Sequence, residues 1–423
     1  MRRLLFAVFC VIFGAGTAGG QTTATPTRAE TIKALLERIG KLETRLGELE
    51  GKLGAQPVAC SMPGESSVGP SSTVQEGVPG VKAAQEPKTP TEAAVAAQEQ
   101  ASYPSLQVRG FADVNFSATD QHGSTSGFNL GQFALHIASP LSRKVSYFGE
   151  ISFSAQSTGF NLEVERSVIR YDYNDYFKIS FGRYHTPINY WNTGFHHGLW
   201  LQTTISRPEM IQFGGRFLPA HFVGLLAEGN IPSGGVGLGY NVGLGNGRGS
   251  IISRAGDAGD INNHRAWVLS LFSRPTAARG LQVGGALYRD KLSPGGRPGV
   301  REFITSAHIV WAREKPEFLA EFANVHHRNI STGQVSNSQA FYVQLAYRLQ
   351  WLDNHFKPYY RFEYIHTPRS EPVLAVPGLV GSTVGMRYDI SAYAAFKGEY
   401  RNTRRQAGEP RVNGVFLQTS FTF

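Results

Sequence analysis

The chain has 423 residues, of which 41% are hydrophobic and 17% charged, and its formal net charge is +9. A helical membrane protein of this size would contain several apolar runs of about 18 residues or more, whereas only the extreme N-terminus comes close. The 48 glycines, 17 tyrosines, 27 phenylalanines and mean hydropathy of −0.22 instead favour strands with one polar and one apolar face. A transmembrane β-barrel and a large soluble β-protein both fit this composition.

Residues 1–20 predict a secretory signal peptide. Arg2 and Arg3 form a basic start, and an apolar stretch and a run of small residues follow them, as in cleaved export signals. The apolar stretch is too short to span a bilayer comfortably. Removal of the signal leaves Cys60 as the one cysteine, which cannot form an intramolecular disulfide.

Residues 27–54 predict a short coiled-coil helix, because apolar residues recur at alternating spacings of three and four. Charges beside this seam match between parallel copies, which favours self-association over packing on the chain's own barrel. Residues 55–102 predict a flexible linker, since they are rich in Pro, Gly, Ser, Ala, Gln and Glu and contain no aromatic residue. The apolar seam of the predicted coiled-coil helix consists of Ile32, Leu35, Ile39, Leu42, Leu46, Leu49 and Leu53.

Residues 103–423 predict an all-β, antiparallel transmembrane barrel. Beyond the signal, every aromatic residue lies in this region. Phe341, Val343 and Leu345 would face one way, while Gln344 and Arg348 would face the other. Such alternation continues over stretches that match the roughly 9–11 residues of a membrane-crossing strand and exceed the roughly 5–6 residues of a soluble one.

The alternation and the turn residues between its stretches predict sixteen strands, an even number as bacterial barrels require. Residues 209–217 could form another strand, which would raise the count to eighteen. The sixteen predicted strands are 106–117, 127–138, 143–155, 160–172, 176–185, 221–231, 235–246, 263–273, 280–290, 301–313, 316–328, 337–349, 354–366, 378–389, 390–402 and 412–423.

The last predicted strand ends on Phe421 and Phe423, which share an apolar face. A terminal phenylalanine on an amphipathic strand resembles the assembly signal of bacterial outer-membrane proteins. The barrel assembly machinery is therefore an expected partner.

The connection 186–220 after the fifth strand is far longer than its neighbours. In sixteen-stranded porins the external loop at this place folds into the lumen and narrows it. The export signal, coiled coil, linker, sixteen strands and terminal phenylalanine resemble the phosphate-selective porin O and P family, including DcaP-like relatives. This resemblance covers about residues 25–423 as architecture. The residues expected at the constriction are Tyr190, Trp191, His196, His197, Arg207, Glu209 and Arg216.

The resemblance implies a porin of the Gram-negative outer membrane that lets small polar or anionic solutes diffuse passively. With the heptad seam, it also implies a homotrimer whose coiled coil lies in the periplasm. Contacts with the outer membrane and its lipopolysaccharide follow from that location.

The polar faces of the strands place a set of basic residues in the lumen, where rings of cations favour anions. Glutamates on the same faces would offset this field, and the long connection adds only Arg207 and Arg216 as permanent cations. A mildly anion-favouring pore is therefore expected rather than dedicated phosphate capture. Alternatively, outward-leaning arginines would contact lipopolysaccharide phosphates and solvent. The residues assigned inward are Arg109, Lys178, Arg348, Lys357, Arg361, Arg387, Lys397 and Arg401.

Metal and nucleic-acid binding are not expected. The neighbouring pairs His196–His197 and His326–His327 would point to opposite faces of a strand, so neither forms a bidentate metal site. No recognition helix or basic-aromatic cluster accompanies the positive charge. No cofactor is predicted.

Two other functional classes stay open. An outer-membrane lipase would need a Ser–His dyad on its lipid-facing wall; His185 and His308 are candidates, but no spacing compels this interpretation, so we predict no catalytic residue and no enzyme. A non-conducting structural barrel, tethered into the periplasm through the linker, is the second alternative.

Overall fold

The computed structural model describes residues 103–195, 198–212, 216–295, 299–374, 376–405 and 408–423, together with Lys41 and Thr44. The predicted signal peptide and linker lie outside the described residues. So does the predicted coiled coil, apart from Lys41 and Thr44, which are helical. Within the described part of the chain, no helix is both long and apolar enough to span a membrane.

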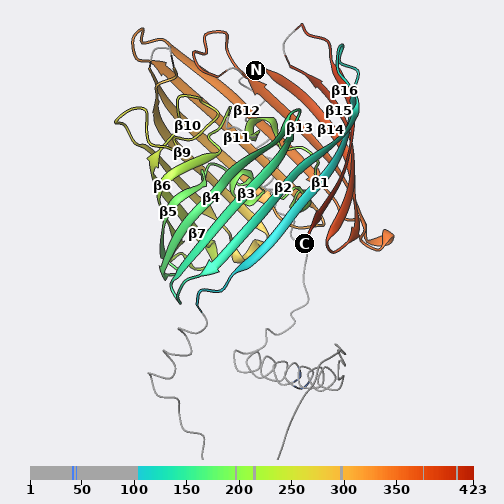
Figure 1. The fold of residues 1–423 in the computed structure, drawn as a ribbon, viewed down its shortest axis with the longest axis horizontal. Coiled ribbons are helices and arrows are strands. Elements are labelled where there is room, and N and C mark those ends of the chain that lie inside the picture. The colour runs from blue at the N-terminus through green and yellow to red at the C-terminus, as the bar shows by residue number, and fades with distance from the viewer. Residues whose placement is uncertain are drawn as a thin grey trace, which may run out of the picture. The chain divides into compact units, whose positions relative to one another are not determined.

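Sixteen strands pair in sequence order and antiparallel, and β1 closes on β16 to complete a barrel (Figure 1). The predicted fold is therefore confirmed. The strands are β1 (Gln107–Thr119), β2 (Gly127–Pro140), β3 (Val145–Gln156), β4 (Gly159–Asn174), β5 (Phe177–His185), β6 (His221–Ile231), β7 (Leu238–Asn246), β8 (Ala266–Ser273), β9 (Leu281–Leu292), β10 (Val300–Trp311), β11 (Glu317–Asn329), β12 (Val335–Ala346), β13 (Phe356–His366), β14 (Leu379–Ser391), β15 (Ala394–Arg404) and β16 (Val412–Thr422).

Short helical turns join some of these strands. One of them explains a small error in the prediction: β7 begins at Leu238 rather than 235, because η3 precedes it and both Gly234 and Gly237 adopt positive φ angles. The turns are α3 (Trp191–Gly194), η1 (Leu199–Leu201), η2 (Glu209–Ile211), η3 (Gly234–Val236), η4 (Thr276–Ala278) and η5 (Gln350–Leu352).

The period-two pattern separates a polar inner face from an apolar outer face. On β12, Ser336, Ser338 and Gln344 are buried, whereas Val343 and Leu345 on the opposite face are 37% and 50% exposed. A barrel in a membrane needs this arrangement, since its outer side contacts lipid tails and its inner side contacts water or protein.

A glycine lies at the seam between the first and last strands, in close contact with the terminal residue. Gly110 and Phe423 exchange two backbone hydrogen bonds of 2.8 and 3.0 Å, and a Cβ atom at Gly110 would lie 2.2 Å from the Phe423 ring. Phe423 is 62% exposed, and its ring centroid lies 6.4 Å from that of Phe421. The structure thus places both terminal phenylalanines at the closing seam; their role in assembly stays a prediction.

The two ends of the barrel differ in their connections. The end that holds Gly110 and Phe423 has short turns such as 141–144, 175–176 and 392–393, and we call it the short-turn end. The longest connections, 186–220, 247–265 and 367–378, belong to the opposite, long-loop end. In bacterial barrels short turns face the periplasm and long loops face the exterior.

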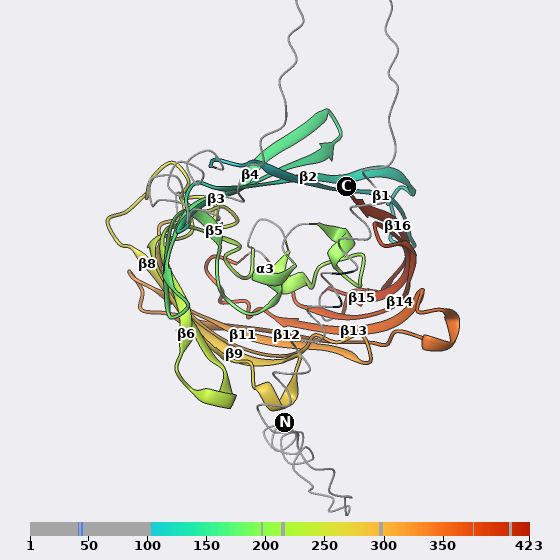
Figure 2. The same ribbon diagram turned by 90° about the horizontal axis from the view of Figure 1, so that it is seen from below.

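Residues 186–220, which we call the inserted segment, join β5 to β6, and their described part lies within the ring of strands, as the green ribbon around α3 shows (Figure 2). Residues 209–211 of the possible extra strand 209–217 form η2, a helical turn, and 213–215 lie outside the described residues; the barrel closes with sixteen described strands. Ile188, Trp191 and Phe217 of the segment are each 1% exposed and belong to the main hydrophobic cluster.

Candidate pore and its inserted segment

The first attachment of the inserted segment is a carboxylate on β11. Glu321 accepts hydrogen bonds from the backbone N–H groups of Tyr190 (2.9 Å) and Trp191 (2.6 Å). The Trp191 ring meets Tyr342 of β12 edge-on, with 5.8 Å between centroids. Burial raises the pKa of the Tyr190 hydroxyl. The start of the segment is therefore held by two hydrogen bonds to one buried carboxyl group and by a packed aromatic ring.

Three inward basic residues bind backbone carbonyls of the segment. Lys397 donates to Leu199 (2.5 Å) and Thr204 (3.2 Å). Arg387 donates to Trp200 (2.7 Å) and Gln202 (2.8 Å). These carbonyls have no strand partner, since the segment is irregular, and a buried carbonyl without a donor is costly.

The third cation is Arg361 on β13. Its guanidinium reaches the Ser206 carbonyl at 2.7 Å and the Ser206 hydroxyl at 2.6 Å. Arg361, Arg387 and Lys397 are 1%, 8% and 0% exposed. These cations therefore face inward, as predicted, and bind the segment; their part in lining a pore stays a prediction.

Carboxylates of the same strands hold backbone and hydroxyl donors. Glu399 accepts from the N–H of Ile205 (2.6 Å), and Glu317 accepts from the hydroxyl of Thr203 (3.0 Å). All these contacts come from β11 to β15, which we call the anchoring wall. The segment is thus bound along this wall by groups of both signs.

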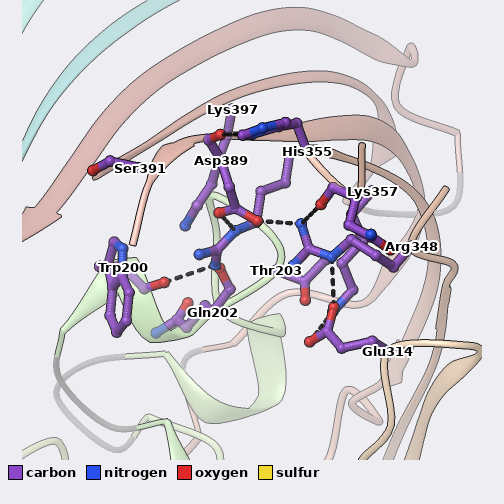
Figure 3. A network of polar contacts seen from close by, with 12 residues as sticks. Trp200, Gln202, Thr203, Glu314, Arg348, His355, Lys357, Asp389, Ser391 and Lys397 are labelled. Carbon is purple, nitrogen blue, oxygen red and sulfur yellow. Dashed lines mark hydrogen bonds and ion pairs between the residues drawn. The ribbon is translucent and has the colours of Figure 1, made fainter. Parts of the chain in front are cut away.

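Most charge on the anchoring wall is paired. Arg348 lies between Glu314 (2.8 Å) and Asp389 (Figure 3). Burial opposes ionisation of Glu314, but Lys357 and Arg348 hold its pKa below the usual value. Five of the eight predicted inward cations have a carboxylate partner. These pairs are Arg348 with Glu314 and Asp389, Lys357 with Glu314 and Glu317, Arg361 with Glu363, Arg387 with Asp389, and Arg401 with Glu399.

Arg109 and Lys178 differ from those five. Arg109 is exposed and shares a face with His136, its partner in the register of β1 and β2. Lys178 lines a cavity of about 480 Å³. Neither has an ion pair among the described residues.

The residues predicted at the constriction differ in burial and in their partners. Arg207 is 3% exposed, and burial lowers its pKa to about 9, while nearby Glu165 and Glu150 oppose the change, so it stays charged at neutral pH. Glu209 pairs with Arg405 at 3.0 Å. Arg216 is exposed. His196 and His197 lie outside the described residues.

Open space lies on the other side of the segment. Cavities of about 440 and 480 Å³ lie between the start of the segment and strands β2 to β10, which we call the cavity wall, and both are lined by His185, Thr193, Leu226 and Glu228. A third cavity, of about 420 Å³, lies near the short-turn end beside Trp200.

The cavity wall carries its own paired charges. Glu150 on β3 contacts His136 (2.9 Å) and Arg166 (2.5 Å), and Glu165 on β4 contacts His221 (2.9 Å). A bulge in β4 opposite Glu150 lets the adjacent Glu165 and Arg166 both reach inward. Among the described residues, no cluster of three or more His, Cys, Asp or Glu side chains could hold a metal ion.

A network at the long-loop end was not predicted from the sequence. Arg248 donates to the carbonyl of Phe217 (2.6 Å) and contacts Glu302 (3.2 Å). His327 bridges Glu302 (2.8 Å) and Glu371 (2.6 Å), the latter in the connection between β13 and β14. Alternation could have placed Glu302 and His327 inward, but no periodicity identifies Arg248 and Glu371, which lie in irregular connections.

The two histidines considered for a lipase-type site face the lumen. His308 lies 3.0 Å from Gln282 and lines the 480 Å³ cavity, and His185 lies 3.6 Å from Glu150. A lipase dyad of the expected kind would lie on the lipid-facing wall.

No protein-family model matches the chain, and no curated protein matches its sequence. Solved structures do. The anion-selective porin from Comamonas acidovorans is 11% identical, with a TM-score of 0.57 over 76% of this chain and 100% of that one. OmpF of Salmonella typhi, in complex with daunomycin, is 11% identical, with a TM-score of 0.53 over 75% and 97%. The outer membrane channel DcaP of Acinetobacter baumannii is 10% identical, with a TM-score of 0.50 over 76% and 97%. At these identities the likeness shows the fold alone: the closed sixteen-stranded barrel is similar to the barrels of outer-membrane porins.

Proposed function

We propose that the protein is an outer-membrane porin through which small polar solutes diffuse passively, and that the inserted segment narrows its pore. One observation carries this proposal: the segment is bound to the anchoring wall, while cavities of about 440 and 480 Å³ lie between it and the cavity wall. Solutes would pass on the cavity side. The resemblance to porins and channels supports the same function.

The pore would favour anions only mildly. Most inward cations on the anchoring wall are neutralised by carboxylates or bound to carbonyls, whereas Lys178 and Arg274 line the 480 Å³ cavity without an ion pair among the described residues. The cavity wall also presents Glu228 beside this lysine. This balance fits a general pore better than the phosphate-selective members of the family that the sequence resembles.

We further propose a homotrimer in the Gram-negative outer membrane, with residues 27–54 forming a periplasmic coiled coil. The heptad seam supports this assembly. Cross-linking in native membranes that yields only monomers would exclude it.

Planar-bilayer recording of the refolded protein tests the pore. We expect discrete open steps and a reversal potential in a KCl gradient that favours chloride slightly. Absence of conductance from folded barrels would refute the open pore and favour the structural barrel, in which the segment acts as a plug. Block by added phosphate at low concentration would instead indicate a dedicated anion site.

A further inference from the structure

A row of basic residues crosses three neighbouring strands at the long-loop end. The register places Lys291 of β9 opposite Arg301 of β10, and Arg301 opposite Arg328 of β11. Arg289 precedes Lys291 by two positions, so it shares the same face. We call these four residues the outer basic row; β9, β10 and β11 lie side by side in the wall (Figure 1).

The row faces outward. The residues that alternate with it, Asp290, Glu302 and His327, are buried on the lumen side, whereas Arg289, Arg301 and Arg328 are exposed. The row is therefore separate from the pore, because the strand backbone lies between them.

The row lacks carboxylate partners. Directly opposite side chains have Cβ atoms about 4.5–5.5 Å apart, so like charges there repel one another. Among the described residues, no carboxylate forms an ion pair with any of the four. Asp290 and Glu302 are the nearest in sequence, but they face the lumen, where they bind Tyr288, Arg248 and His327. By contrast, the neighbouring Arg265 pairs with Asp260 at 2.8 Å.

The position of the outer basic row indicates which kind of anion binds it and reduces the repulsion between its positive charges. Trp267 and Phe303 lie directly opposite Arg289, and exposed apolar residues such as Leu287 and Ile309 continue toward the short-turn end. Aromatic residues mark the edge of the apolar band of an outer-membrane barrel. The row thus lies at the level of lipid headgroups, where an arginine on the lipid side costs little.

We propose that the outer basic row binds the phosphate groups of lipopolysaccharide, with the acyl chains of the lipid lying on the apolar face of β9 to β11. This inference rests on the proposed outer-membrane location, in which the long-loop end faces the exterior. A guanidinium matches phosphate in a bidentate geometry, and three adjacent cations suit a headgroup with more than one phosphate. A free phosphate ion fits less well, because the row lies beside the apolar band.

The proposal is tested by measuring the binding of lipid A to the purified protein in detergent with native mass spectrometry. The probes are bisphosphorylated lipid A and the same lipid without phosphates. The variant is Lys291→Gln/Arg301→Gln/Arg328→Gln. The matched control, Lys144→Gln/Arg279→Gln/Arg313→Gln, removes three exposed cations at the short-turn end. We expect the variant to lose at least about tenfold in affinity for the phosphorylated lipid, since it removes three charge-assisted contacts, and the control to match the wild type.

Equal affinity of variant and wild type, equal affinity for the two lipids, or displacement of lipid A by equimolar inorganic phosphate would each overturn the proposal. Heat-modifiable migration on gels verifies that each variant is folded, and Arg301→Gln alone gives a milder version of the test. Conductance recorded on the same samples separates the two proposals. A wild type that binds lipid A but does not conduct refutes the porin and leaves the row supported.

Discussion

The two sides of the lumen use the same kinds of residues for different purposes. On the anchoring wall, Arg387 and Lys397 are buried and bind carbonyls of the inserted segment. On the cavity wall, Lys178 lines an open cavity, and no described carboxylate pairs with it. An inward cation therefore does not define a selective pore by itself. The effect of such a cation on solutes depends on whether its hydrogen-bond donors are already bound to another part of the chain.

The largest expected effect is release of the segment from the anchoring wall. Arg387→Met/Lys397→Met removes donors to four backbone carbonyls, and each charge-assisted bond contributes about 1.5–3 kcal/mol. Asp389 keeps Arg348 as a partner. We expect single-channel conductance to rise and to become noisier, while Lys144→Met leaves it unchanged. Wild-type conductance in the double variant would show that these bonds do not hold the segment.

Loss of the first attachment is expected to affect stability. Glu321→Ala leaves the N–H groups of Tyr190 and Trp191 without their acceptor in a buried site, at a cost of about 1–3 kcal/mol for each group. The temperature at which the folded band disappears on heat-modifiability gels should fall. Glu321→Gln retains an acceptor oxygen, so this temperature should fall less in that variant. Equal temperatures for Glu321→Ala and the wild type would contradict this assignment.

A pH-dependent contribution is expected where the anchoring wall meets the connection between β13 and β14. Burial opposes ionisation of Glu371, but hydrogen bonds from His327 and Ser336 lower its pKa to about 2. Because the folded-state pKa is depressed, the carboxylate stabilises the fold above its unfolded pKa, and this stabilisation is lost as the pH falls toward 2.

Glu371→Gln should therefore lower thermal stability at pH 7, by on the order of 1–2 kcal/mol, and match the wild type near pH 2. Glu409→Gln, at an exposed position, serves as the control and should match the wild type at both pH values. A constant difference between Glu371→Gln and the wild type across this range would rule out the carboxylate as the source.

The fold could be predicted from the sequence because each strand carries its own signal. Alternation along β12 and β13 locates both strands, since one face must be apolar for lipid. The hydrogen-bond partners of the inward cations could not be predicted in the same way. Arg387 and the Trp200 carbonyl are 187 positions apart, and the carbonyl belongs to a segment without periodicity. The outer basic row was missed for a related reason: Arg289, Asp290 and Lys291 place charge on both faces, so alternation of polarity does not distinguish them.

The smallest expected effect concerns selectivity. Lys178→Gln removes a cation without a described ion-pair partner from the 480 Å³ cavity and leaves Glu228 there, so the reversal potential in a KCl gradient should shift toward potassium while conductance changes little. Arg109→Gln removes an equally unpaired cation that is exposed and lines none of the three cavities described above, so its shift should be smaller. The two variants together locate the path of the ions. A larger shift in reversal potential for Lys178→Gln means that the ions pass along the cavity wall. If neither variant shifts the reversal potential, the ions pass too far from both residues to be affected by their charge.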